Sequence, residues 1–285
     1  RTMEADSSVN EFRAFNRYLN SFIGLDGWHE YAEQNLGEEL GYYSVIYVRN
    51  LISATIMYYL LGMSWSWLVS NSNRILGMQV FKGGETKREG SVLDQMILAQ
   101  MSVFLYAGLP VLDEVLIESG FTKVYMNISD IGGFPSYVMM TVTYFLLVEV
   151  GIYWMHRSLH TNPLLYKYIH KLHHKYNTPD TLSPWASIAF NPLDGILQAC
   201  PYTVVMLFWP IHYITHFVML FCTAIWATNI HDCLVGDTEP LMGSKYHTIH
   251  HTHYNCNYGQ YLTLCDWMWG TLKLPGKDKV SGKSD

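Results

Sequence analysis

Histidines in three short groups carry the strongest chemical signal in this chain. HRSLH contains two of them, and HKLHH and HTIHH contain three each. On a helix, residues three or four positions apart share one face, with Cβ atoms about 5 to 6 Å apart, so each group can aim its imidazoles at one point. The eight side chains are His156, His160, His170, His173, His174, His247, His250 and His251.

Imidazole nitrogens are ligands for iron, zinc, copper and nickel. Because four ligands complete a zinc site, eight histidines grouped in this way predict two metal ions. Surface or packing histidines would explain one such group, but they do not explain three groups in series.

Two further residues lie close to these groups along the chain. His231, in NIHDC, precedes the third group by sixteen residues and is either a ninth ligand or a residue that orients a ligand. Glu149 lies about two helical turns before His156 inside an apolar stretch. We expect Glu149 either to hydrogen-bond a ligand imidazole or to make an interhelical polar contact.

The remaining histidines are expected to have other roles. His212 and His216 repeat the i, i+4 spacing, but they follow Pro210 on the predicted opposite side, so we expect interfacial positions. His253 is expected to support the third group rather than bind metal, and His29 is expected to be structural.

The composition indicates a membrane protein. Of the 285 residues, 49% are hydrophobic and only 15% are charged, and the net charge of −6 comes without a basic run, which excludes nucleic-acid binding. The polar N-terminal segment shows no cleavable signal. The five cysteines include no CxxC pair and predict neither a disulfide framework nor a thiolate zinc site. Nucleotide-binding, flavin and haem motifs are absent, so electrons for redox chemistry would come from a partner.

Apolar stretches must position the histidines. Four are long enough to cross a hydrocarbon core that requires about 20 residues, and the last, interrupted at Trp209-Pro210, predicts two spans joined by a hairpin. They cover residues 43–69, 93–112, 134–155 and 193–230. The expected fold is an all-α integral membrane bundle of about four to five spans, with a cytoplasmic helical cap that carries a di-metal site.

The predicted organisation has five parts. They are a polar N-terminal extension (1–42), transmembrane helices (43–155), a segment with the first two histidine groups (156–192), a transmembrane hairpin (193–230) and a segment with the third group and the tail (231–285). Lysine and arginine concentrate in 70–92, 156–192 and the tail, which predicts that all three groups face the cytoplasm. Basic residues near the first two groups either dock an acidic electron carrier or only reflect this topology; they are Arg157, Lys167, Lys171 and Lys175.

The histidine groups and their surroundings also resemble a known family. HRSLH, HKLHHKYN and HTIHHTHYN resemble the three histidine boxes of the membrane fatty acid hydroxylase and sterol desaturase superfamily. The linking sequences TLSPWASIAFNPLDGILQACPY, IWATNIHDC and NYGQYLTLCDWMWGT are similar to those of sterol C-5 desaturases, particularly from plants and algae. The resemblance extends from about Asn73 to the C-terminus and does not include the first seventy residues.

The resemblance implies an oxidoreductase of the endoplasmic reticulum membrane. It would take a Δ7-sterol from the lipid bilayer and introduce the C5–C6 double bond, removing one hydrogen at C5 and then one at C6. Dioxygen would be reduced to water with electrons from cytochrome b5 and its reductase. The eight histidines, with His231 as an addition, would bind two iron ions, which zinc could replace in purified or crystallised protein. Asn191, Asp194 and Asp266 would orient ligands or cap helices.

Aromatic side chains near the histidines could form a flat apolar slot for sterol rings, or they could anchor the protein at the membrane interface. They are Tyr153, Trp154, Trp185, Phe190, Trp226, Trp267 and Trp269.

Two alternatives to a C-5 desaturase stay open. A sterol C-4 methyl oxidase or a fatty acyl or lipid hydroxylase of the same superfamily would use the same ligands, because both reactions begin with the same hydrogen abstraction. A non-catalytic, histidine-rich zinc-binding membrane protein is the alternative from a different class, although a transporter would hold its ligands near the bilayer midplane.

Overall fold

The computed structural model describes residues 3–75, 88–177, 181–232 and 238–275. Cys233 and several lysines used to assign the cytoplasmic side, Lys82, Lys87, Lys277, Lys279 and Lys283, lie outside these residues. The described chain is predominantly helical, which confirms the all-α prediction. Its α-helices are α1 (Met3–Phe22), α2 (Asp26–Leu36), α3 (Glu38–Ile75), α4 (Arg88–Tyr106), α5 (Leu109–Glu118), α6 (Phe134–Thr161), α7 (Pro163–Tyr168), α8 (Pro192–Phe208), α9 (Tyr213–Ile230), α10 (Ser244–His253) and α11 (Leu264–Met268).

Four helical segments are long and apolar enough to cross a membrane, and α8 is a shorter apolar helix. This agrees with the prediction of four to five spans. The four segments are Glu38–Ile75, Val92–Glu118, Phe134–Thr161 and Tyr213–Ile230. The second was expected to end at residue 112, but α5 continues it to Glu118 after a break between Tyr106 and Leu109.

The predicted hairpin between the last two apolar helices is present. α8 ends at Phe208, just before the Trp209-Pro210 pair, and α9 begins at Tyr213. Proline has no backbone N–H and cannot continue a helix in this position. The turn contains the short strand β2 (Ile211–His212), which pairs in parallel with β1 (Val124–Tyr125). This pairing fixes one end of the bundle.

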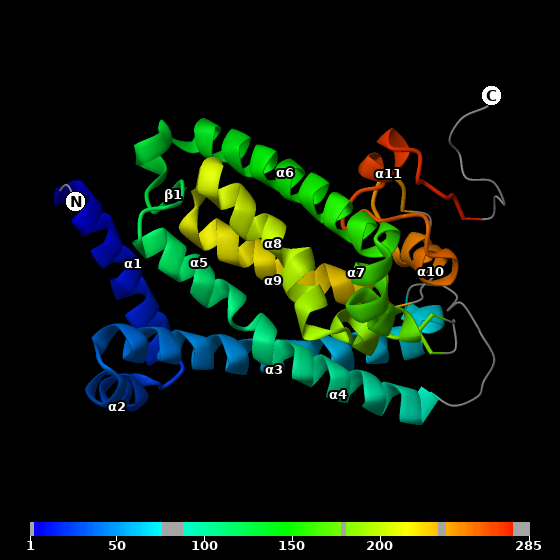
Figure 1. Cartoon of the computed structure of the whole chain (residues 1–285), viewed down its shortest axis with the longest axis horizontal. Coiled ribbons are helices and arrows are strands. Elements are labelled where there is room, and N and C mark those ends of the chain that lie inside the picture. Colours follow the sequence, from blue (N-terminus) through cyan, green and yellow to red (C-terminus); the bar gives the residue numbers. More distant parts are fainter. Residues whose placement is uncertain (1–2, 76–87, 178–180, 233–237, 276–285) are drawn as a thin grey trace.

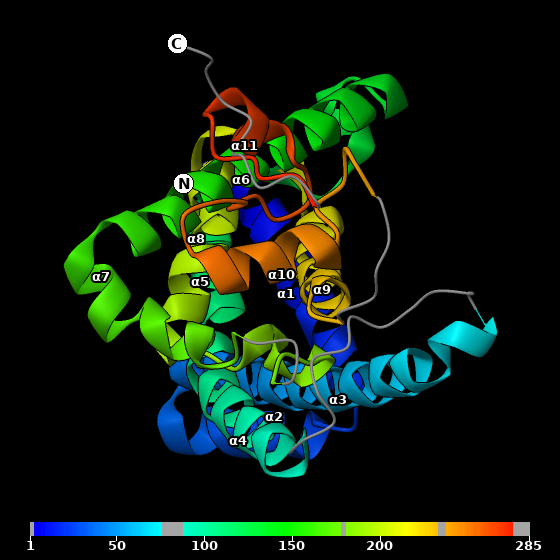
Figure 2. The ribbon, with the colours of Figure 1, turned by 90° about the vertical axis from the view of Figure 1, so that its right-hand side faces the viewer.

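The long helices lie side by side, and the two ends of the bundle differ (Figure 1). α1 and α2 lie at one end, whereas α7, α10 and α11 lie at the other. Between the ends, α6, α8 and α9 enclose a core in which Tyr144, Ile152, Tyr202 and Met206 are almost completely buried. Figure 2 shows α10 lying across the end of the bundle, close to the termini of α6 and α9. Three 3-10 helices complete the described helical elements: η1 (Ile128–Ile131), η2 (His170–Lys175) and η3 (Pro184–Ile188).

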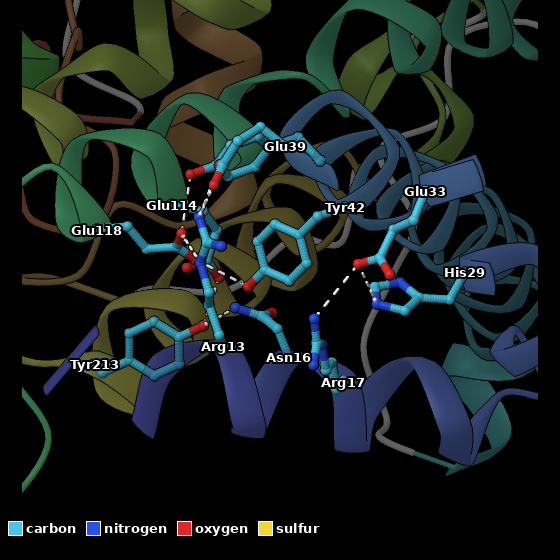
Figure 3. A network of polar contacts seen from close by, with 11 residues as sticks. Arg13, Asn16, Arg17, His29, Glu33, Glu39, Tyr42, Glu114, Glu118 and Tyr213 are labelled. Atoms are coloured by element: carbon cyan, nitrogen blue, oxygen red, sulfur yellow. Dashed lines mark hydrogen bonds and ion pairs between the residues drawn. The ribbon is translucent and has the colours of Figure 1, made fainter. Parts of the chain in front are cut away.

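The N-terminal segment, expected to be a polar extension, packs against the bundle through α1. Phe12 of α1 belongs to the main core, with 4% of its surface exposed. Arg13 of α1 binds Glu39 at 2.7 Å and Glu118 at 2.8 Å. Asn16 donates a hydrogen bond to the Tyr213 hydroxyl (Figure 3). These contacts join α1 to α3, α5 and α9.

Candidate metal centre

The fold brings nine histidines into two adjacent clusters. Within each cluster, one nitrogen of every histidine lies within 4.8 Å of one nitrogen of each of the others. The five-histidine cluster contains His156, His160, His170, His174 and His250, and the four-histidine cluster contains His173, His231, His247 and His251. All of these side chains are buried except His160, which is half-buried.

Helical spacing predicted that each sequence group would aim its imidazoles at one point, but HKLHH and HTIHH are each divided between the two clusters. HKLHH forms the 3-10 helix η2, which directs His170 and His174 to one cluster and His173 to the other. On α10, His247 and His251 are four residues apart and stay together, whereas His250 points into the five-histidine cluster. Both η2 and α10 therefore contribute histidines to both clusters, so a shift of either element would move both clusters.

Distances between the imidazole nitrogens match what a shared cation requires. His160 Nε2 lies 2.9 Å from His170 Nε2 and 3.1 Å from His174 Nε2. In the other cluster, His247 Nε2 lies 3.1 Å from the Nε2 atoms of both His231 and His251. Two nitrogens about 2.1 Å from one metal ion lie about 3.0 Å apart at a right angle and about 3.4 Å apart at a tetrahedral angle. The donor set therefore fits a metal in each cluster.

The second ring nitrogen fixes the tautomer of several of these histidines. Nδ1 lies 2.9 Å from the Tyr258 carbonyl for His156 and 2.8 Å from the Cys256 carbonyl for His250. In His231, Nδ1 lies 2.6 Å from the carbonyl of Ala227. A carbonyl only accepts, so Nδ1 carries the proton and the Nε2 lone pair faces the cluster.

Two of these inward nitrogens have no other partner. Nε2 of His156 and Nε2 of His250 are buried and accept no hydrogen bond from the described residues. Leaving a buried polar atom unsatisfied costs about 1 to 3 kcal/mol. A cation bound in the five-histidine cluster would remove this cost.

The histidines outside the membrane-spanning segments are held neutral. Burial, followed by repulsion from neighbouring histidines, lowers the pKa of His247 and His251 well below the ordinary histidine value. Burial also lowers the pKa of His231 to about 4 and that of His250 to about 3. Neutral imidazole is the form that binds a metal ion, so no proton has to leave at neutral pH.

The acidic residues near the clusters have distinct structural roles. Oδ2 of Asp194, at the start of α8, lies 2.8 Å from Nδ1 of His170, and both side chains are completely buried. Asn191 caps α8 by accepting a hydrogen bond from the backbone N–H of Leu193. Asp194 thus contacts a clustered histidine and Asn191 caps a helix, which are the two roles expected for these residues.

Asp266 and Glu149 hold the loop that follows α10. Asp266 accepts hydrogen bonds from the backbone N–H groups of Tyr258 and Gly259, each at 2.8 Å. Glu149 accepts from the backbone N–H groups of three consecutive residues, 260–262. Glu149 is therefore bonded to neither a ligand imidazole nor a second helix among the described residues, but to the backbone of this loop. The loop it holds places the Tyr258 carbonyl against His156.

The remaining histidines lie outside both clusters. His253 is exposed on α10. His216 was expected at the membrane interface, but it is completely buried, with Asp113 at Nε2 and Tyr144 at Nδ1. Asp113 was not identified from the sequence as its partner, because the two residues are 103 positions apart. Nε2 of His212, in β2, lies 2.8 Å from the Met126 carbonyl oxygen, just after β1.

An apolar cavity borders the four-histidine cluster. His173, His231 and His247 form part of its wall. Of the aromatic side chains expected to form a sterol slot, Phe190 lines this cavity. The others do not line it: Trp185 packs on Tyr58, and Trp267 is 66% exposed. Most of the named aromatic side chains therefore do not line this cavity, whose wall includes aliphatic side chains such as Leu61, Val103 and Ile152 and the rings of Tyr58 and Tyr106.

Comparison with known proteins gives a consistent set of relatives. The fatty acid hydroxylase family profile matches residues 141–271, which include all nine clustered histidines. A Delta(7)-sterol-C5(6)-desaturase from Nicotiana tabacum is 44% identical over 94% of both chains. A putative Delta(7)-sterol-C5(6)-desaturase 2 from Arabidopsis thaliana is 39% identical over 98% of this chain and 95% of its own.

A more distant relative comes from an animal. The lathosterol oxidase of Rattus norvegicus is 31% identical over 84% of this chain and 78% of its own length. No solved structure is significantly similar to this chain.

Proposed function

This chain belongs to the sterol C-5 desaturase family of the fatty acid hydroxylase superfamily, and from that premise we propose that it introduces the C5–C6 double bond into Δ7-sterols. The chain is an oxidoreductase of this family. The observation that carries the proposal is the similarity to a Delta(7)-sterol-C5(6)-desaturase over 94% of both chains. The apolar cavity beside the four-histidine cluster supports it, because a sterol is an apolar substrate.

The metals we propose are two iron ions, one in each cluster. The five-histidine cluster would hold one ion and the four-histidine cluster the other, with His231 as a ligand of the second. When bound, a pair of irons supplies the two-electron activation of dioxygen that removal of hydrogen from an unactivated C–H bond requires. Zinc would bind the same imidazoles and could occupy them in purified protein.

Side chains and backbone carbonyls of the chain would orient the histidines that bind the metals. Asp194 and the carbonyls of Tyr258 and Cys256 hold imidazole rings in one tautomer. Glu149 and Asp266 fix the loop that carries two of these contacts. The cavity reaches only members of the four-histidine cluster, so C5 and C6 of the sterol would approach there.

The partners and location follow from the same proposal. We place the protein in the endoplasmic reticulum membrane with both clusters toward the cytoplasm, where cytochrome b5 and its reductase supply electrons. Lys175 forms an ion pair with Asp94, whereas Lys171 forms none with the described residues. Lys171 and neighbouring basic groups would attract the acidic surface of an electron carrier.

Sterol analysis tests the proposed function. Cells lacking the protein should accumulate Δ7-sterols, and the wild-type chain should restore Δ5,7-sterols. Accumulation of 4-methyl sterols would instead identify a C-4 methyl oxidase, and an unchanged sterol profile would contradict both activities. His250→Ala should fail to restore the product, while His253→Ala, an exposed position on the same helix, should restore it.

A further inference from the structure

A second cavity continues the first along α9. We call the cavity beside the four-histidine cluster the proximal cavity and the one between α1, α3, α5 and α9 the distal cavity. The two share wall residues on α3, α4 and α9. These residues are Ala54, Met57, Tyr106 and Ala224. The two cavities therefore adjoin between the middles of these helices, with these four side chains between them.

The two cavities differ in volume. The proximal cavity has a volume of about 90 Å³ and the distal cavity about 350 Å³. Sites for small organic molecules commonly measure about 300 to 1,000 Å³. The proximal cavity alone is too small for a sterol, whereas the two together reach the lower part of this range.

The joined cavity runs along α9 over a length that suits a sterol. Ala224, at the junction, lies about 10 Å along the helix from His231, and Phe217 in the distal cavity lies about 20 Å from it. The distance from His231 to Ala224 accommodates fused rings that begin at the histidines. The distance from His231 to Phe217 accommodates a side chain that extends beyond the rings.

Polar side chains line the far end of the distal cavity. Arg49 lies on this wall and donates to the side chain of Asn16. Glu114, also on this wall, accepts from the Tyr213 hydroxyl, and Figure 3 shows Glu114 and Tyr213 beside Asn16. α1 covers this end with Phe15 and Leu19. The polar wall limits how far an apolar side chain can extend.

Chemistry excludes the reversed orientation of the substrate. The 3-hydroxyl of a sterol is two carbons from C5, so it must lie near the metals whenever C5 does. The proximal cavity has polar groups for it, including the almost completely buried Ser187 and Thr228. The hydrocarbon side chain at C17 must then point away from the histidines.

From this arrangement we propose that the distal cavity is the binding site for the sterol side chain. This inference rests on the proposed function and adds a specificity determinant to it. C5 and C6 lie beside the four-histidine cluster at the proximal cavity, the remaining rings extend along α9 towards Ala224, and the side chain occupies the distal cavity between α1, α3 and α9. Substrate choice at C17 is thus decided on α3 and α9, away from the metals.

A pair of substrates tests the proposal in membranes from cells that lack their own activity. One is a Δ7-sterol with its full side chain, and the other is the same ring system without a side chain. Ala224→Phe would fill the junction, so the ratio of kcat/KM for the full sterol to that for the truncated sterol should fall roughly tenfold or more. Cys222→Phe, on the exposed face of the same helix, is the matched control and should leave the ratio unchanged.

The outcomes separate this inference from the proposed function. If the wild type converts neither substrate, the function itself fails. If the wild type converts both substrates and Ala224→Phe leaves their ratio at the wild-type value, only the side-chain site is wrong. Ala54→Phe, which approaches the junction from α3, should repeat the result of Ala224→Phe.

A labelling experiment needs no substitution. A Δ7-sterol with a photoreactive group at the end of its side chain should label the wild-type chain within residues 213–221, at the distal end of α9. Labelling confined to residues 184–190 or 227–231, beside the four-histidine cluster, would overturn the proposal.

Discussion

Asp194 Oδ2 lies 2.8 Å from Nδ1 of His170, and neither side chain is exposed. Asp194 also accepts a hydrogen bond from Gln198 one turn further along α8. The carboxylate therefore joins the apolar helix α8 to a histidine of the five-histidine cluster. A carboxylate behind a ligand imidazole fixes the orientation of its ring and raises its basicity.

Asp194→Asn should weaken metal binding. The amide keeps the shape of the side chain but loses the charge, and loss of such a partner commonly costs about 10- to 100-fold in metal affinity or activity. Chelator competition on purified protein measures the change. Asn191→Ala is the control: it removes the α8 cap at a cost of about 0.5 to 2 kcal/mol of stability but should leave metal affinity unchanged. An equal loss of affinity in both variants would argue against a specific role for Asp194.

Substitution of one histidine in each cluster should separate the two proposed metals. His250→Ala removes a member of the five-histidine cluster, and His173→Ala removes a member of the four-histidine cluster. Each should weaken binding of the ion in its own cluster, so that a chelator removes about one of the two ions per chain at concentrations that leave the wild-type content unchanged, as measured by elemental analysis. His253→Ala should keep the wild-type content. A wild-type content near one ion would contradict the two-metal proposal.

Glu149→Gln should destabilise the protein while metal stays bound. Oε1 of the carboxylate accepts hydrogen bonds from the backbone N–H groups of residues 260–262, and Oε2 lies 3.1 Å from the Tyr261 nitrogen. In the amide, the charge that strengthens these bonds is lost and Nε2 faces the Tyr261 N–H, which a lower thermal unfolding midpoint would reveal. Glu39→Gln, at an exposed carboxylate, should change the midpoint much less. Loss of metal without a change in midpoint would instead indicate that Glu149 acts on a ligand.

The metal-free protein should lose stability as the pH falls below neutral. The pKa of His231 is lowered to about 4 and that of His250 to about 3, whereas both titrate near 6.5 in the unfolded chain. Between these values the unfolded state binds more protons, so the stabilising contribution is complete above about pH 6.5 and declines toward pH 4. Thermal midpoints of metal-stripped protein between pH 7.5 and 5 should fall with pH. A midpoint that rises on acidification would show that the histidines are not held neutral by the fold.

His216→Ala should lower stability without changing the metal content. The substitution leaves the completely buried Asp113 carboxylate without its imidazole partner, and breaking a buried pair costs about 3 to 5 kcal/mol. Thermal unfolding and elemental analysis of the same preparation check both parts. A lower metal content in a stably folded variant would indicate that the His212/His216 pair binds metal after all.

The residue types and their spacing were sufficient to predict the apolar helices, the break at Trp209-Pro210 and a gathering of histidines that could bind metal. These features depend on local properties: apolar length, the missing N–H of proline and the shared face of residues i and i+4 on a helix. Similarity to a family, rather than any local pattern, indicated Asp194 and Asn191 as residues that would orient ligands or cap helices.

The tertiary structure alone decided how the histidines divide between clusters and which groups lie behind them. His173 is separated from its neighbour His174 because η2 is a 3-10 helix that lies between α6 and α10, and neither condition is visible in HKLHH. The carbonyls of Tyr258 and Cys256 leave no signal in a sequence, because every residue has a carbonyl. The contact between Glu149 and Leu262 joins positions 113 residues apart, and the joined cavity exists only where α3 and α9 meet. Periodicity describes one element at a time, whereas these features arise from the packing of several elements against one another.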